Sequence, residues 1–282
     1  MAVSIAHLGP PGTYAEAAAL TAAYWHQQKT GQEAILCPYP SIAQTLKAVA
    51  QGQAQWAIVP VENSIEGGVT MTLDALWQLD TLNIQQDLIL PISHALIARA
   101  AHIGAIKTVY SHPQGLAQCQ IWLEKFLPLA QLIATNSTTE GLQHLEQDIT
   151  SAVISSQRAA TLYNLPVLAC PINDHPDNCT RFLIMSLEPS PGGRHTSLAF
   201  SMKANQPGVL VKPLQLFAEK NINLSRIESR PTKRLLGDYV FFIDLEADYR
   251  EATTQAVLAD LATYTETLKI FGSYNTLPRP TS

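Results

Sequence analysis

The sequence predicts a two-lobed α/β protein followed by a smaller ferredoxin-like domain. The chain has 282 residues, which leaves room for two domains of the usual ~100–200 residues each. Up to residue 187, short apolar runs alternate with longer segments of helical periodicity, as in βα units around parallel sheets. From residue 196 onward the segments follow the order βαββαβ, which is the split βαβ pattern of ferredoxin-like domains.

Strands and helices are predicted in pairs along the first part of the chain. Each strand of the first three pairs precedes its helix: strands 3–8, 34–39 and 56–61, and helices 13–28, 41–51 and 69–79. Ser41 is expected to cap the second helix, and Gly52 to follow its last residues. Residues 87–98 read as one long extended segment, and this change of pattern indicates that a second α/β lobe begins nearby.

The second lobe is expected to continue the alternation. Its predicted strands are 107–112, 131–136, 151–156 and 166–172, and its predicted helices are 115–127, 139–147 and 157–165. Residues 180–187 form a further strand. Two prolines and two glycines within 188–195 mark a linker. The strands expected after the linker are 196–203, 223–229, 238–247 and 268–274, and the helices are 209–221 and 251–265.

Composition and charge argue against several classes of protein. Hydrophobic residues make up 46% of the chain and charged residues 15%, which suits packed cores rather than disorder. The formal net charge is -5 and no basic run stands out, so neither nucleic acid nor an anionic membrane is an expected partner. The N-terminus lacks the pattern of a signal peptide, and no stretch reaches about 18 apolar residues. We therefore expect a cytoplasmic protein.

The cysteines give no sign of a metal site. Cys37, Cys119, Cys170 and Cys179 form no CxxC pair, and no histidine stands at zinc-ligand spacing from them. Reduced thiols are the expected state, and no metal or cofactor is expected.

Two stretches in the first part of the chain carry polar residues directly after a predicted strand. In "LGPPGTYAEAA", Gly9 and Gly12 permit tight turns, and Thr13 begins a capping box whose free N–H groups favour an anion. In "VENSIEGG", residues 62–64 place a carboxylate, an amide and a hydroxyl where a strand ends. Ligands of open α/β sheets gather at such strand ends. The alternatives are a well-capped helix and an ordinary polar turn.

Two later stretches have the same arrangement. "YSHPQG" brings Ser111 and His112 to the start of a helix, where they are either site residues or a cap and a surface imidazole. In "DNCTRF", Thr180 offers a hydroxyl and Arg181 a guanidinium able to hold a carboxylate at two points. A strand start with an ion pair is the alternative. Together the four loops predict a small, anionic, oxygen-rich ligand in a cleft between lobes.

These stretches, in this order, resemble the prephenate dehydratase family. The resemblance rests on "GPPGTYAEAA", "VPVENSIEGGV" followed by "TLDAL", "SHPQGLAQC" and "NCTRF", and on "PGVLVKPL" and "IESRP" near the C-terminus. The last two resemble the phenylalanine-binding motifs of a regulatory ACT domain. The resemblance implies two lobes of the periplasmic-binding-protein type (type II) and then an ACT domain. The expected bounds are 1–188 for the catalytic domain (lobe 1 about 1–85 and 176–188, lobe 2 about 86–175) and 195–276 for the ACT domain.

The function implied by the resemblance is that of a hydro-lyase. Prephenate would lose carbon dioxide and water and become phenylpyruvate, in L-phenylalanine biosynthesis, with feedback regulation by L-phenylalanine. One alternative is arogenate dehydratase, which acts on the transaminated substrate and yields L-phenylalanine. A solute-binding or sensor protein of the same architecture is the other alternative. Export is disfavoured by the missing signal peptide, and a transcriptional sensor by the missing helix-turn-helix segment. A homodimer or homotetramer is expected, because ACT domains resemble modules that pair side by side.

The resemblance also assigns residues. Thr180 is expected beside the leaving hydroxyl and Arg181 as a carboxylate clamp, and the proton source stays open among Thr180, His112 and Glu62. The expected substrate-binding residues are Thr13, Tyr14, Asn63, Ser64, Ser111, Gln114 and Phe182. The expected effector-binding residues are Gly208, Val209, Leu210, Asn223, Leu224, Glu228, Ser229 and Arg230.

Overall fold

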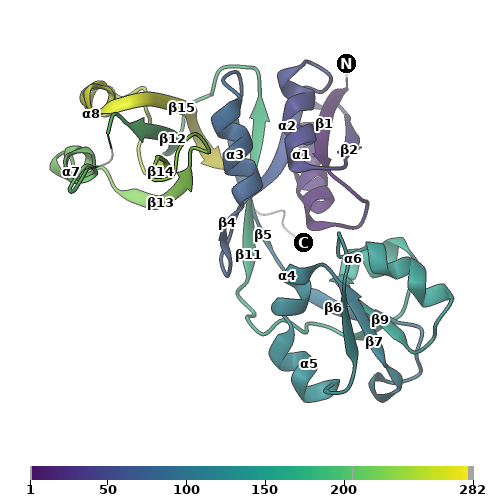
Figure 1. Ribbon diagram of the computed structural model, residues 1–282. Helices are drawn as coiled ribbons and strands as arrows, with labels where there is room; N and C mark the ends of the chain where they lie inside the picture. The colour runs from purple at the N-terminus through teal and green to yellow at the C-terminus, as the bar shows by residue number, and fades with distance from the viewer. Residues whose placement is uncertain (1, 205, 279–282) are drawn as a thin grey trace.

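The computed structural model of the protein describes residues 2–204 and 206–278. This part of the chain forms three bodies, two lobes and a C-terminal domain (Figure 1). We call the body with the N-terminal strand lobe 1 and the body around the five-stranded sheet lobe 2. Lobe 1 lies between lobe 2 and the C-terminal domain, as Figure 1 shows.

Lobe 1 is built on a mixed sheet. In spatial order its strands are β5 (Asn83–Pro91), β11 (Cys179–Ser186), β3 (Trp56–Asn63), β1 (Val3–Leu8) and β2 (Ala34–Tyr39), and the two-residue β4 (Gly67–Gly68) pairs with the end of β3. Its helices are α1 (Tyr14–Thr30), α2 (Ile42–Ala50) and α3 (Thr70–Gln78). Strand β1 is parallel to both β2 and β3, as the sequence predicts. Strand β11 runs antiparallel to β3 and β5 because the chain returns through it from lobe 2.

Local signals in the sequence explain the ends of these helices. The Thr13 side chain accepts the N–H of Glu16 and so caps α1, and Ser41 caps α2 in the same way through Gln44. Gly52, expected just beyond α2, has the positive φ of 71° that favours glycine. Both expected caps are therefore confirmed.

Lobe 2 surrounds a five-stranded sheet. Its strands in spatial order are β10 (Val167–Ala169), β6 (His94–Ala98), β9 (Ser151–Ser156), β7 (Thr108–Ser111) and β8 (Gln131–Ala134). Its helices are α4 (Pro113–Ala117), α5 (Gln120–Phe126) and α6 (Gln157–Leu162), with 3₁₀ turns at Ile103–Ala105 and Glu140–Glu146. The helix expected over 115–127 is thus broken at Cys119. The cause is Asp174, whose carboxylate accepts the N–H groups of Ile121 and Trp122 and caps a separate helix.

The chain crosses between the lobes within residues 87–98, the stretch expected to be one extended segment. Strand β5 pairs with β11 along its whole length and ends at Pro91, whereas β6 belongs to the other sheet. The first strand of the lobe 2 sheet therefore follows Pro91. Asn173, on the returning segment, holds both crossings together: its amide donates to Ile92 O at 2.8 Å and accepts from His94 N at 2.6 Å.

The C-terminal domain has the predicted βαββαβ order. Its elements are β12 (His195–Met202), α7 (Val211–Glu219), β13 (Leu224–Pro231), β14 (Tyr239–Leu245), α8 (Ala252–Tyr264) and β15 (Thr265–Thr276). The strands form an antiparallel sheet in the order β13-β14-β12-β15, which is ferredoxin-like. Helix α7 begins at Val211, two residues later than expected, because Gly208 with its φ of 78° belongs to a turn before it.

The C-terminal domain is fused to lobe 1 rather than tethered to it. The end of β15 pairs in parallel with β5, so one sheet runs through both bodies. A single apolar core joins Phe242, Phe271 and Tyr274 of the C-terminal domain to Leu73 and Leu76 of α3. This junction places the C-terminal sheet beside β5, which in turn pairs with β11, the strand that carries Thr180 and Arg181.

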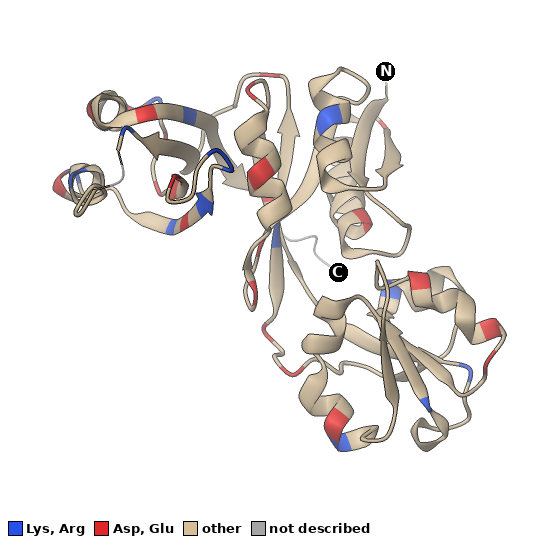
Figure 2. Ribbon diagram, in the orientation of Figure 1, with Lys and Arg blue, Asp and Glu red and all other residues tan. Residues whose placement is uncertain are grey.

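Charged residues are dispersed over all three bodies (Figure 2). Within residues 2–204 and 206–278, no helix is long and apolar enough to cross a membrane.

Candidate active site

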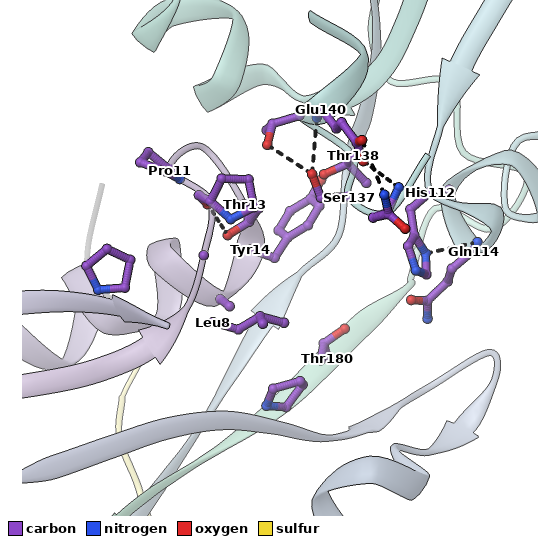
Figure 3. A pocket seen from close by; sticks show the side chains of 18 of the residues that line it. Leu8, Pro11, Thr13, Tyr14, His112, Gln114, Ser137, Thr138, Glu140 and Thr180 are labelled. Carbon is purple, nitrogen blue, oxygen red and sulfur yellow. Dashed lines mark hydrogen bonds between the residues drawn. The ribbon is translucent and has the colours of Figure 1, made fainter. Parts of the chain in front are cut away.

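A cleft of about 1260 Å³ lies between lobe 1 and lobe 2. Its lobe 1 wall is formed by the ends of β1, β3 and β11 and by the start of α1, and its lobe 2 wall by α4 and the segment 136–146. Figure 3 shows Thr180 on one side of this space and Ser137, Thr138 and Glu140 on the other. The cleft exceeds the roughly 300–1,000 Å³ of ordinary ligand pockets, so a small substrate fits with water around it.

The structure brings seven of the expected residues to the cleft wall. They are Thr13, Tyr14, Asn63, His112, Gln114, Thr180 and Phe182. Four others do not line it: Glu62, Ser64, Ser111 and Arg181.

Thr180 is held by the neighbouring strand. It lies opposite Asn63 in the β11–β3 register, and the Asn63 side-chain N–H donates to Thr180 Oγ1 at 3.0 Å. The other end of the amide is fixed as well, because Asn63 Oδ1 accepts from the N–H groups of Ile65 and Glu66 at 3.0 and 3.2 Å. Since the Thr180 oxygen already accepts a hydrogen bond, its own proton is available to a group in the cleft.

A buried polar network connects this pair to lobe 2. The Asn63 amide also donates to Asn178 Oδ1 at 2.9 Å, and Asn178 donates to Gln118 Oε1 at 2.9 Å. The same Gln118 oxygen lies 3.0 Å from His94 Nε2, while the Gln118 N–H donates to Glu66 at 3.0 Å. Hydrogen-bonded networks of this kind restrict the positions of the groups within them. The position of Thr180 therefore depends on both lobes.

His94 is a neutral imidazole in this network. Burial lowers its pKa, and the hydrogen bond that it donates to Gln118 only partly opposes that effect. Because Gln118 presents its oxygen, the proton of His94 sits on Nε2. The Nδ1 atom is buried and has no hydrogen-bond partner among the described residues. His94 also packs edge-on against Tyr14 with 5.9 Å between ring centroids.

Sequence reasoning missed Asn178, Gln118 and His94. The first two lie inside the stretches "DNCTRF" and "SHPQGLAQC", but nothing in a single sequence distinguishes them from the residues beside them. His94 begins a buried strand, where a lone histidine gives no signal. All three are identified only by the hydrogen-bonded network that they form between the two lobes.

No lysine or arginine is among the described residues that line the cleft. Hydroxyl groups of residues 137–139 line it, together with the start of α1, where Thr13 caps the helix. The N–H groups of Asn136 already donate to the Glu140 carboxylate. His112 adds an imidazole whose Nδ1 accepts the N–H of Gln114 at 3.2 Å (Figure 3), so its neutral form carries a proton on Nε2.

Direct contacts between the lobes narrow the cleft at the Gly12 turn. Ser156 of lobe 2 donates to Gly12 O at 2.8 Å, and Arg158 of α6 pairs with Glu16 of α1. Gly12 has a φ of 87°, and a Cβ there would lie 3.2 Å from Ala159 and from Thr139. The turn therefore requires glycine for both its conformation and its close approach to lobe 2.

Arg181 and Glu62 face away from the cleft, which corrects the expectation for both. Successive side chains of a strand point to opposite faces, so Thr180 and Arg181 cannot both line the same wall. The Arg181 guanidinium donates to Glu62 Oε2 at 3.1 Å and pairs with Asp244 of β14. It also donates to the Tyr274 hydroxyl at 3.3 Å. Arg181 thus contacts the C-terminal domain instead of clamping a substrate carboxylate.

Ser64 and Ser111 support the cleft from behind. Ser64 Oγ accepts the N–H of Cys179 at 3.0 Å, which fixes the residue just before Thr180. Ser111 is fully buried and donates to Ile154 O at 2.7 Å. Ser64 and Ser111 were expected to contact the substrate, but in the structure their hydroxyls bind the backbone.

The expected effector residues fall into two groups. Glu228 and Arg230 face lobe 1 from β13, a strand along which acidic and basic residues lie together (Figure 2). Glu228 pairs with Arg226 at 2.7 Å, and its carboxylate lies against the backbone of Gly68. Arg230 pairs with Asp74 of α3 at 3.2 Å. Both residues therefore already have partners at the junction between lobe 1 and the C-terminal domain.

The second group lies on the side of the C-terminal domain away from lobe 1 or in the turn before α7. It comprises Gly208, Val209, Leu210, Asn223, Leu224 and Ser229. Val209 lines a separate cavity of about 290 Å³, and Ser229 is exposed on β13. Among the described residues, no side chain caps the start of α7.

Comparisons with known proteins agree with this architecture. A family model described as prephenate dehydratase matches residues 5–190, and a model of the ACT domain matches residues 196–262. The bifunctional chorismate mutase/prephenate dehydratase of Aquifex aeolicus is 38% identical over 275 residues, which is 96% of this chain and 73% of that protein.

Two solved structures extend the comparison. The prephenate dehydratase of Arthrobacter aurescens in complex with L-Phe has a TM-score of 0.85 and 34% identity, covering 97% of this chain and 90% of that one. A protein described as a novel type of quorum-quenching acylase has a TM-score of 0.80 and 26% identity, covering 98% of each chain.

The fold and the cleft define a two-lobed α/β enzyme with a C-terminal ACT domain. The matches over most of its length place it more closely: the chain belongs to the prephenate dehydratase family.

Proposed function

We propose that this chain converts prephenate to phenylpyruvate with loss of carbon dioxide and water. The observation that carries the assignment is the Thr180–Asn63 pair, buried at the wall of an interlobe cleft in a chain of this family. The pair supplies an oriented O–H group, which is what departure of the ring hydroxyl requires. We propose Thr13, Tyr14, Gln114 and Phe182 as further contacts of the substrate, since all four line the cleft.

Thr180 acts as the proton donor in this proposal. The C–O bond of the ring hydroxyl breaks, the hydroxyl takes the Thr180 proton and leaves as water, and the electrons of the ring–carboxylate bond complete the aromatic ring as carbon dioxide departs. Negative charge develops on Thr180 Oγ1, where the Asn63 N–H is already in place to stabilise it. Proton-transfer help of this kind is worth roughly 10²–10⁴-fold in rate. His112, which lines the cleft, is positioned to return the proton.

The substrate carboxylates are held by neutral donors. The hydroxyl groups of residues 137–139 and the start of α1 line the cleft, and the helix N-terminus favours an anion. Without a guanidinium clamp, orientation depends on how closely the two lobes approach each other. The contacts of Gly12, Glu16 and Arg158 set that approach.

A direct assay distinguishes the candidate reactions. We expect the purified chain to form phenylpyruvate from prephenate with a higher kcat/KM than it forms L-phenylalanine from arogenate. Arogenate dehydratase is the second candidate because Glu140 and Glu146 line the cleft, where a carboxylate would favour the ammonium group of arogenate. A higher kcat/KM for arogenate would reverse the order, and no turnover of either substrate would refute the proposed enzyme.

L-Phenylalanine is the proposed inhibitor, bound by the ACT domain near the turn 208–210. The uncapped start of α7 leaves N–H groups for its carboxylate, and Ser229 is exposed on the same domain. Coupling between two sites is typically 1–3 kcal/mol, so we expect L-phenylalanine to weaken apparent prephenate affinity by roughly 5- to 150-fold. Calorimetry that detects no binding of L-phenylalanine to the intact chain would contradict this regulation.

A homodimer or homotetramer and a cytoplasmic location complete the proposal. Strand β13 is the outer strand of its sheet and carries the exposed Ile227, which suits pairing with a second copy of the chain. All four cysteines are free thiols, the usual state in a reducing compartment. Analytical ultracentrifugation measures the assembly: a monomer at all concentrations would contradict it.

A further inference from the structure

The reverse side of the Thr180 strand carries a buried group of charges that joins three strands of lobe 1 to the ACT domain. Arg181 projects from β11 with a side chain only 15% exposed. Around it lie Glu62 of β3 at 3.0 Å, Asp87 of β5 at 3.6 Å and Asp244 of β14, which pairs with its NH2 group. The reaction proposed above uses none of these four residues. The group is therefore unexplained by substrate chemistry.

Asp244 is the member of this group that belongs to the ACT domain, and it is buried and hydrogen-bonded. It is 4% exposed, accepts a hydrogen bond from Ser197 Oγ and lies 3.6 Å from Arg226. The same Ser197 hydroxyl is 2.6 Å from the Tyr274 hydroxyl, which in turn accepts from Arg181. Asp244 and Tyr274 thus form one rigid acceptor for the Arg181 guanidinium.

Arg181 links this acceptor to the cleft because it adjoins Thr180 in the chain. The two side chains point to opposite faces of β11, so a movement of the Arg181 side chain turns the peptide that also carries Thr180. The Asn63–Thr180 hydrogen bond of 3.0 Å is sensitive to such a turn. The strand also departs from regular register at this point, between Arg181 and Phe182.

Asp87 of lobe 1 is a second carboxylate close to Arg181. Asp87 is 3% exposed, and its Oδ1 has no hydrogen-bond partner among the described residues. Its other oxygen is 3.6 Å from Arg181, too far for a good hydrogen bond. If the ACT domain withdraws Asp244, the guanidinium has an acceptor to move to. Such an exchange would give Arg181 two alternative arrangements, which is what transmission between sites requires.

We propose that Asp244 of the ACT domain is a positioning residue for the dehydratase reaction, which holds Thr180 in place through Arg181. The active site is then complete only when the ACT domain presents Asp244. Exchange of Arg181 between Asp244 and Asp87 is the route by which effector binding reaches Thr180, and this last step rests on the regulation proposed above.

The test compares two interdomain ion pairs in the intact chain. Asp244→Asn keeps the size of the side chain and removes its charge. Asp80→Asn is the matched control, because Asp80 pairs with Lys269 across the same junction without touching β11. Misplacement of a reacting group by about 1 Å costs up to ~10²-fold, so we expect Asp244→Asn to lower kcat about 10-fold with KM changed less than about 2-fold. The control should keep kcat within about 2-fold.

A milder variant guards against misfolding. Tyr274→Phe removes only the hydroxyl that accepts from Arg181, and it should lower kcat about 3-fold at an unchanged KM. Thermal unfolding of each variant shows whether a loss of activity merely follows a loss of fold. If both Asp244→Asn and Tyr274→Phe keep wild-type kcat, the inference is overturned.

Response to L-phenylalanine gives an independent readout. In Asp244→Asn, L-phenylalanine should still bind by calorimetry, but its effect on apparent prephenate affinity should fall at least about 5-fold relative to wild type. An undiminished effect in this variant would overturn the exchange of Arg181 partners. A wild-type chain that turns over prephenate but ignores L-phenylalanine would refute the proposed regulation instead, while the kcat values of the variants would still decide the role of Asp244.

Discussion

Thr180→Val is expected to lower kcat by roughly 10²-fold or more, with little change in KM. Valine keeps the shape and β-propensity of threonine, so strand β11 should form as before. What disappears is the hydroxyl that the Asn63 amide orients toward the cleft. Because the lost interaction operates in the transition state, the loss should appear in kcat. Steady-state kinetics with prephenate measure it.

The control for this substitution is Thr108→Val. Thr108 lies on β7 of lobe 2, outside the residues that line the cleft. The same chemical change there should leave kcat within about 2-fold of wild type. A Thr180→Val enzyme with near-wild-type kcat would remove the hydroxyl from the chemistry, and His112 would become the stronger candidate for the proton donor.

The order of secondary structure could be predicted because the local signals agree with the fold. Alternating apolar runs, the caps at Thr13 and Ser41 and the glycine at 52 all act within a few residues, and the structure follows them. The break between α4 and α5 could not be predicted in this way. Its cause, Asp174, is more than 50 residues away in sequence from the N–H groups that it caps.

The candidate site was predictable to the level of the loops but not of the side chains. Strand-end polarity indicated where the cleft would lie, and Asn63 and Thr180 do meet there. The sequence alone does not show to which side of β11 the Arg181 side chain points. Its partners on the side away from the cleft, Glu62 and Asp244, come from different parts of the chain. Gln118 and His94 enter the network only once the lobes close.

Arg181→Met is expected to lower the free energy of unfolding by about 3–5 kcal/mol, the usual cost of removing one partner from a buried ion pair. Methionine fills much of the arginine volume, so packing is largely kept. Glu62, Asp87 and Asp244 are then left as a group of carboxylates without their central cation. Urea unfolding at neutral pH measures the change. Arg234→Met is the control: its pair with Glu266 is exposed, so this substitution should change the free energy of unfolding little.

The same substitution should change how stability depends on pH. In the wild type, burial acts to raise the pKa of Asp244, but Arg181 and Arg226 outweigh it and hold this pKa below its usual range. Asp244 therefore adds stability above its unfolded pKa, and that stability is lost as the pH falls through its folded pKa. For Asp87, burial outweighs the effect of Arg181 and raises the pKa. The charged form of Asp87 therefore destabilises the fold, and this destabilisation disappears when the carboxylate is protonated.

Without Arg181, the folded pKa values of Asp87 and Asp244 should both be higher than in the wild type, with Arg226 still close to Asp244, and the folded state should gain protons as the pH falls. The stability difference between wild type and Arg181→Met is therefore expected to be largest near pH 7 and smaller by about pH 5. Adding Asp244→Asn to Arg181→Met should recover part of the loss, because one of three neighbouring carboxylates that have lost their shared cation is removed. A stability difference that stays constant with pH, together with no recovery in the double variant, would mean that Arg181 stabilises the junction through packing alone.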